Sequence, residues 1–154
     1  MTFFRAPFFL SWIYPELIWR VNNSAKDIYL TFDDGPVPGP TEFVLRELAK
    51  YNAQATFFCI GDNVRKNRGI FRKVVEAGHM IGNHTFNHLS GWKTSSAKYL
   101  DNIRKCQDEF GLDLQEPSLG PIRSKYPPLF RPPYGRIKRR QIRQIQDYKI
   151  YMWD

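Results

Sequence analysis

Residues 28–36 read Ile-Tyr-Leu-Thr-Phe-Asp-Asp-Gly-Pro, an apolar run that ends abruptly in two carboxylates and a turn. A short stretch rich in β-branched and aromatic residues, closed by Gly and Pro, predicts a β-strand, here over residues 28–32. Residues 41–51 follow with apolar side chains at helical spacing, and residues 55–60 form a second short apolar run. The order strand, helix, strand is the building unit of a parallel sheet.

The same alternation continues to the end of the chain. We expect further helices over residues 63–77, 96–110 and 137–146, and further strands over residues 80–83, 129–130 and 149–153. Repeated strand–helix units indicate an α/β fold, either a parallel sheet or a (β/α) barrel. In such folds the chemistry takes place just beyond the carboxyl ends of the strands, so polar residues at these positions are the first candidates for a site.

Asp33 and Asp34 follow the first expected strand directly. Neighbouring side chains of a strand point to opposite faces, but the sharp turn at Gly35-Pro36 can direct both carboxylates toward one site. One carboxylate is then able to bind a metal ion while the other accepts a proton. The alternative interpretation is an Asx turn that merely closes a loop.

His84 and His88 follow the third expected strand, and the whole chain has only three histidines. Side chains at positions i and i+4 lie on the same side of a helical turn, so both imidazoles can bind one ion. A carboxylate and two imidazoles form an open ligand set for Zn²⁺ or a similar ion. The alternative is a pair of surface or core histidines. The third histidine, His79, lies between a helix and a strand, and we expect it to be structural.

The sequence Arg131-Pro-Pro-Tyr134-Gly135 follows the fourth expected strand. Its two prolines restrict the backbone, which would direct the Arg131 guanidinium and fix the peptide N–H of Tyr134. An arginine beside a carboxylate lowers the pKa of that carboxyl group and orients it. The alternative is an ordinary proline-rich loop in which the arginine forms a surface ion pair.

These three motifs, in this order and each at a strand end, resemble the polysaccharide deacetylases of carbohydrate esterase family four, the NodB homology domain. The resemblance extends from about Lys26 to Trp153, and the phrase Gly78-His-Met-Ile-Gly-Asn-His-Thr85 is similar to the region of the family's second motif. It implies a distorted (β/α) barrel. It also implies a hydrolase that removes N-acetyl groups from a polysaccharide such as peptidoglycan or a chitin-like polymer.

The resemblance also assigns roles to residues. The metal ligands would be Asp34, His84 and His88, and Zn²⁺ is the expected ion, although family members also use other divalent ions. Asp33 would act as the general base that takes a proton from water, with Arg131 holding it in place. The backbone N–H of Tyr134 would stabilise the negative charge that develops on the acetamide oxygen when water attacks the carbonyl carbon.

The sequence departs from the family pattern at its carboxyl end. Two further family motifs, one of which contains a histidine that protonates the leaving amine, lie beyond Asp154, and no histidine follows His88. We therefore expect one deacetylase-like domain over residues 1–154 that is incomplete at its carboxyl end, with residues 1–25 as an aromatic amino-terminal segment. The unfinished barrel edge favours self-association. The alternative function is that of a catalytically impaired fragment that binds metal and carbohydrate.

Composition limits the other classes of function. The chain has 23 Lys and Arg against 15 Asp and Glu, a net charge of +8, so nucleic acid or an anionic wall polymer is a conceivable partner. The basic run over residues 136–143 is expected to be the exposed face of a helix that buries Ile137, Ile142 and Ile145. The sequence contains no recognisable nucleic-acid-binding module, so we expect no nucleic-acid partner.

The amino-terminal segment and the cysteines give no strong signal of location. Residues 3–19 are apolar but interrupted by charges and prolines, which predicts neither a transmembrane span nor a cleavable signal peptide. A cytoplasmic location is the default expectation, and association with the cell envelope stays open. Cys59 and Cys106 do not form a disulfide framework, and we expect both to be simple thiols rather than ligands.

Overall fold

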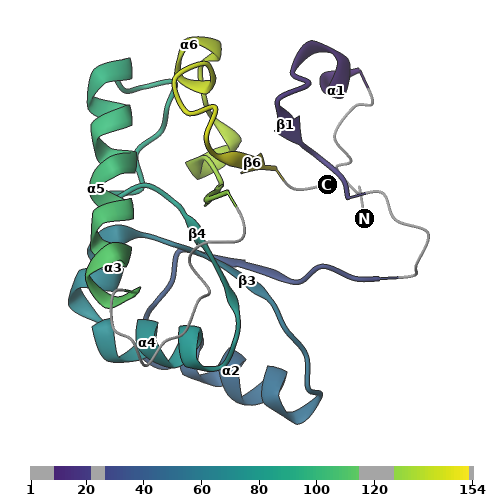
Figure 1. Cartoon of the computed structure of the whole chain (residues 1–154), viewed down its shortest axis with the longest axis vertical. Coiled ribbons are helices and arrows are strands. Elements are labelled where there is room, and N and C mark those ends of the chain that lie inside the picture. Colours follow the sequence, from purple (N-terminus) through teal and green to yellow (C-terminus); the bar gives the residue numbers. More distant parts are fainter. Residues whose placement is uncertain (1–8, 22–26, 115–126, 153–154) are drawn as a thin grey trace.

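A computed structural model describes residues 9–21, 27–114 and 127–152 of the chain. Within these residues six strands form one parallel sheet in the order β1-β6-β5-β4-β3-β2. The strands are β1 (Leu17–Ile18), β2 (Thr31–Asp33), β3 (Thr56–Cys59), β4 (Met80–Asn83), β5 (Leu129–Phe130) and β6 (Lys149–Tyr151). The sheet curls into a half-barrel, which Figure 1 shows opening away from the long helices.

The long helices lie along the outer side of the curved sheet (Figure 1). The helices are α1 (Leu10–Ile13), α2 (Pro40–Lys50), α3 (Gly61–Lys66), α4 (Arg68–Glu76), α5 (Ser96–Leu114) and α6 (Arg139–Ile142), with a 3₁₀ turn, η2, at Pro133–Gly135. A helix between consecutive strands returns the chain to the start of the next parallel strand, so the polar residues that follow each strand meet at one edge of the sheet.

Two groups of buried side chains hold this arrangement together. The first joins β3 to α3, α4 and α5, and in it the rings of Phe71 and Phe110 stack with centroids 5.3 Å apart. The second joins β5 and β6 to α5 and α6, with Phe130 and Ile150 fully enclosed. Each apolar side chain of this size that is removed from water contributes about 1.5–3 kcal/mol to the stability of the fold. This packing fixes the strand ends relative to one another.

Most of the elements expected from the sequence are present, and several differ in extent. The helix expected over residues 96–110 continues to Leu114 in α5, and the last expected strand ends at Tyr151 in β6, with residue 153 outside the described residues. The helix expected over residues 63–77 is broken at Asn67, whose side-chain amide donates to the carbonyl oxygen of Pro36 at 3.1 Å. The strand expected over residues 28–32 is limited to Thr31–Asp33 in β2. The basic helix is only four residues long in α6, although the three isoleucines expected to be buried are buried.

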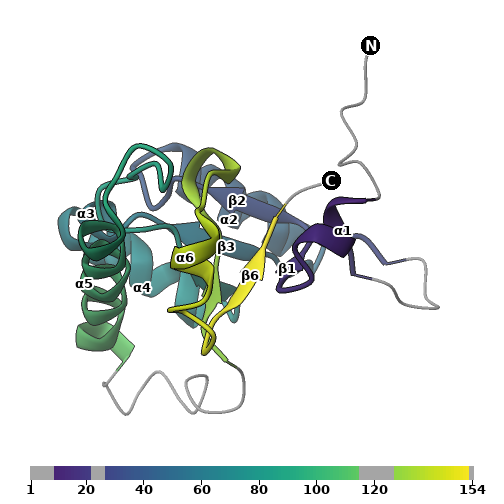
Figure 2. The same ribbon diagram turned by 90° about the horizontal axis from the view of Figure 1, so that it is seen from above.

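Part of the amino-terminal segment belongs to the sheet. Leu17 and Ile18 of β1 pair in parallel with Ile150 and Tyr151 of β6, and Leu17 is buried in the second core group. Figure 2 shows α1 and β1 beside β6 at one end of the sheet, and β2 lies at the other end of the strand order. The two edge strands are therefore β1 and β2. Self-association through such an edge stays a prediction.

No helix in the described part of the chain has the length and apolar character needed to cross a membrane. The two cysteines are free and buried, Cys59 in β3 and Cys106 in α5.

Candidate metal centre

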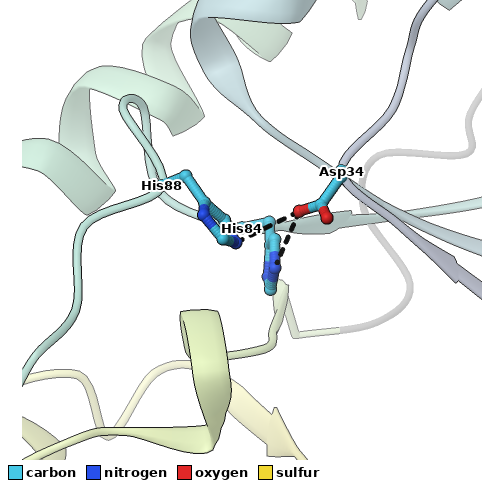
Figure 3. Close-up of side chains that lie close together, drawn as sticks. All are labelled: Asp34, His84 and His88. Atoms are coloured by element: carbon cyan, nitrogen blue, oxygen red, sulfur yellow. Dashed lines mark ion pairs between the residues drawn. The ribbon is translucent and has the colours of Figure 1, made fainter.

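Three side chains from two separate strand ends converge at the carboxyl edge of the sheet. Asp34 follows β2, and His84 and His88 follow β4 (Figure 3). One ligand atom from each lies within 4.8 Å of the others. Asp34 Oδ1 is 3.1 Å from Nε2 of His88 and 3.5 Å from Nε2 of His84. The structure thus brings together the three residues predicted to bind a metal.

The backbone at the site takes a conformation that most residues avoid. Asp34, His88 and Tyr134 have φ values of 69°, 54° and 59°, in the left-handed region. Residues with a side chain adopt this region rarely, and such positions cluster at functional sites. At Asp34 the conformation is held by Asn63 of α3, whose side-chain amide donates to the Asp34 carbonyl oxygen at 2.8 Å. This turn directs the carboxylate toward the histidines.

The hydrogen bonds on the far sides of the imidazoles decide which nitrogen is free. Nδ1 of His84 lies 2.7 Å from the carbonyl oxygen of Arg131, and a carbonyl only accepts, so this nitrogen carries the hydrogen and donates. Nδ1 of His88 lies 3.1 Å from the hydroxyl of Tyr134. Burial lowers the pKa of His84, which favours its neutral form. The Nε2 lone pair of neutral His84 therefore points into the site.

The residues fit a divalent cation because of this arrangement of acceptors. A carboxylate oxygen and an unprotonated Nε2 both accept hydrogen bonds, so their approach to within 3.5 Å is unfavourable unless a positive charge lies between them. Protonation of His84 would supply the charge, but the lowered pKa opposes it. One carboxylate and two imidazoles, each imidazole oriented by a second hydrogen bond, form a donor set suited to such an ion.

Asp33 and Arg131 form an ion pair beside the three ligands. Nη1 of Arg131 donates to Asp33 Oδ1 and to the hydroxyl oxygen of Thr31, both at 2.8 Å. The guanidinium carbon lies 4.1 Å from the centre of the Phe58 ring, and Arg131 as a whole is only 5% exposed. The surface ion pair weighed in the sequence analysis is therefore wrong. The arginine is enclosed and holds one carboxylate in a fixed position.

Tyr134 contributes both its side chain and its backbone. It lies in η2 after β5, its hydroxyl reaches His88, and its ring packs on that imidazole with centroids 4.6 Å apart. The next two N–H groups, of Gly135 and Arg136, donate to proline carbonyls within the turn. The turn therefore uses those two donors internally, and the role expected for the Tyr134 N–H stays a prediction.

The sequence analysis missed two buried asparagines that shape the histidine loop. Asn83 Oδ1 accepts from the N–H of Thr85, and Asn83 Nδ2 donates to Ile103 in α5. Asn102 Oδ1 accepts from the N–H groups of Phe86 and Asn87, both at 2.9 Å. A signal was available, since an asparagine in the middle of a long helix is unfavourable unless its amide has a specific partner.

His79 is placed as the sequence analysis expected. It is buried against the ring of Phe57, with ring centres 5.3 Å apart, and burial lowers its pKa. It lies at the start of β4, at the opposite end of that strand from His84. It therefore takes no part in the metal centre.

Comparison with known proteins agrees with this geometry. Residues 20–153 match the family model of polysaccharide deacetylases. A peptidoglycan-N-acetylglucosamine deacetylase of Bacillus cereus is 38% identical over 137 residues, which cover 88% of this chain and 60% of that protein. The peptidoglycan-N-acetylglucosamine deacetylase PgdA of Listeria monocytogenes is 34% identical over 124 residues, which cover 78% of this chain and 24% of that protein.

The fold of a solved relative is also close. The crystal structure of the Bc1960 peptidoglycan N-acetylglucosamine deacetylase superposes with a TM-score of 0.81 at 30% identity, covering 96% of this chain and 65% of that one. The chain thus spans less than two thirds of the length of these relatives. The distorted (β/α) barrel architecture expected from the motifs is confirmed. Because the family model matches residues 20–153, most of this chain, the chain belongs to the polysaccharide deacetylase family, carbohydrate esterase family four.

Proposed function

We propose that this chain is a metal-dependent hydrolase domain that removes N-acetyl groups from an N-acetylated polysaccharide, with peptidoglycan as the first substrate class to test and chitin-like polymers as the second. The observation that carries the proposal is the convergence of Asp34, His84 and His88 beside the Asp33–Arg131 ion pair. The Bacillus cereus and Listeria monocytogenes relatives are named as peptidoglycan-N-acetylglucosamine deacetylases, which supports the substrate class.

Zn²⁺ is the ion we propose for the site, because one carboxylate and two imidazoles leave further coordination positions open. When bound, a divalent ion of this kind lowers the pKa of water from 15.7 toward about 7 and polarises a carbonyl group. Asp34 follows β2 and both histidines follow β4, and each of these strands pairs with β3, which sets the spacing of the three ligands.

Asp33 is the group that would accept the proton of the attacking water. Nη1 of Arg131 donates to Asp33 Oδ1 at 2.8 Å and so holds this carboxylate in a fixed position. The N–H of Tyr134 would donate to the acetyl oxygen as negative charge develops on it. Protonated Asp33 would then return its proton to the sugar nitrogen as the carbon–nitrogen bond breaks, which releases acetate and leaves an amine.

A second function follows from the positions of the histidines. Two of the three face Asp34 and the third is buried at the opposite end of β4, so none of them is placed to protonate the leaving amine. If Asp33 cannot perform both proton transfers, the chain would bind metal and carbohydrate with little turnover.

Acetate release separates the two functions. The chain loaded with Zn²⁺ is incubated with the N-acetylglucosamine pentamer and, separately, with peptidoglycan glycan fragments, and acetate is measured enzymatically. We expect release that stops in Asp33→Asn, while Zn²⁺ binding by calorimetry persists in that variant and is lost in His84→Ala. Zn²⁺ and pentamer binding without acetate release would support the binding function instead. Absence of Zn²⁺ binding would contradict both.

A further inference from the structure

The loops that carry His88 and Tyr134 continue into a second structure, which we call the paired loops and define as residues 89–95 and 135–138. Three hydrogen bonds join them directly, one of them from the Lys138 ammonium group to the carbonyl oxygen of Thr94 at 2.7 Å. The N–H of Gly91 donates to the carbonyl oxygen of Arg136 at 2.9 Å, and the indole N–H of Trp92 donates to the carbonyl oxygen of Ile137 at 3.1 Å. The paired loops therefore begin at the metal centre and extend away from it as one unit.

A buried glutamine of α6 forms hydrogen bonds with both of the paired loops. Gln141 of α6 is fully enclosed, its amide nitrogen donates to the Gly91 carbonyl oxygen at 3.1 Å, and its amide oxygen accepts from the N–H of Lys138 at 2.8 Å. A Cβ atom on Gly91 would lie 2.5 Å from the Arg136 carbonyl oxygen and 2.7 Å from the Gln141 amide oxygen. Only glycine fits this contact, so the loops are held closely and in one register.

Trp92 is the residue that this frame presents to solvent. Its side chain is 60% exposed even though its N–H is already bonded to the backbone. The guanidinium carbon of Arg136 lies 5.5 Å from the centre of the indole ring. A large aromatic ring that stays exposed forgoes the stabilisation that its burial would give. Packing in the core therefore does not explain why a buried hydrogen-bond network holds this ring in place.

We propose that Trp92 and Arg136 form a second sugar-binding position, which takes a pyranose ring of the same glycan chain next to the sugar held at the metal centre. One face of a pyranose ring consists largely of C–H groups and packs on the electron-rich face of an indole. The ring hydroxyls can accept from the Arg136 guanidinium. This inference rests on the proposed function for the identity of the polymer, but the binding itself does not require turnover.

Continuity with the metal centre supports a sugar as the occupant. Trp92 follows His88 by four residues and Arg136 follows Tyr134 by two, so both proposed sugar-binding residues lie on segments that also carry residues of the metal centre. A fixed indole binds a sugar ring without losing side-chain freedom, because the hydrogen bond to Ile137 has already restricted it. The position thus favours oligomers over a single sugar.

The test compares the N-acetylglucosamine pentamer with the monomer. In the Zn²⁺-loaded chain, Trp92→Ala should weaken pentamer binding about tenfold by calorimetry and raise KM for the pentamer by a similar factor, with kcat and monomer binding unchanged. Trp92→Phe should retain most of the affinity. Trp12→Ala, which removes an exposed indole from α1, is the matched control and should bind like wild type.

A second measurement does not depend on the folding of any variant. In wild-type protein the indole N–H resonance of Trp92 should shift with the pentamer and stay unmoved with the monomer. Equal weakening of monomer and pentamer by Trp92→Ala, or an unmoved Trp92 resonance with bound pentamer, overturns the proposal. Pentamer binding that depends on Trp92 without acetate release leaves this inference standing while the deacetylase function fails. If acetate is released and pentamer binding does not depend on Trp92, the deacetylase function stands and this inference fails.

Discussion

The ion pair between Arg131 and Asp33 gives a quantitative test of the site. Arg131→Leu removes a guanidinium that donates to Asp33 Oδ1 and Thr31 Oγ1 at 2.8 Å and to the Met152 carbonyl oxygen at 3.3 Å. Breaking a buried pair by removing one partner costs about 3–5 kcal/mol. The Asp33 side chain stays 30% exposed, so water solvates part of the remaining charge and the expected loss is about 2–3 kcal/mol.

Urea denaturation of the metal-free protein measures this loss. Arg140→Leu removes an exposed arginine of α6 and should change the free energy of unfolding by less than about 0.5 kcal/mol. A double-mutant cycle of Arg131→Leu with Asp33→Ala should give a coupling energy of about 2 kcal/mol. A coupling energy near zero would refute this reasoning, because the arginine would then act through its other partners, Thr31, Met152 and the Phe58 ring.

Three further predictions follow from buried groups. Phe71→Ala should lower the free energy of unfolding by about 3–5 kcal/mol in urea, since the ring is fully enclosed between α3, α4 and α5; a change below about 1 kcal/mol would contradict the described core. Asn102→Ala should weaken Zn²⁺ affinity by about 10–100-fold in a competition titration, because the Asn87 N–H loses its acceptor and the Phe86 N–H keeps only the Asn102 backbone carbonyl, whereas Asp101→Ala, its exposed neighbour, should not. Burial lowers the pKa of His79 and His84, so below about pH 6.5 the unfolded state binds more protons than the folded state. The urea concentration at the unfolding midpoint of the metal-free protein should therefore decrease as the pH is lowered from 7 to 5, and a midpoint that does not change with pH would contradict this.

The positions of the site residues could be predicted because they follow from local pattern. Asp34 and His84 each come directly after a short strand, and parallel strands bring such positions to one edge. The spacing of His84 and His88 suggested a helical turn, and here the reason was wrong although the result was correct. His88 has a left-handed φ of 54°, so a loop rather than a helix brings the two imidazoles together.

Other features depend on partners that are distant in the sequence. The break at Asn67 requires the Pro36 carbonyl oxygen, 31 residues away, and no local signal in residues 63–77 reports it. The strand at Leu17–Ile18 has only two residues and exists because β6 lies beside it. Gln141 looked like part of a basic exposed helix, but its amide is used entirely inside the protein.

The left-handed residues of the metal centre have a consequence for anyone who wishes to make this protein more heat-resistant. A non-glycine residue in that region costs roughly 1 kcal/mol or more, so Asp34, His88 and Tyr134 are positions where glycine would relax the backbone. Each replacement would also delete a side chain of the site. Selection for thermal stability alone would therefore favour glycine at these three positions. The resulting proteins would be more stable but would have lost side chains of the candidate metal centre, which is the usual trade-off between stability and activity.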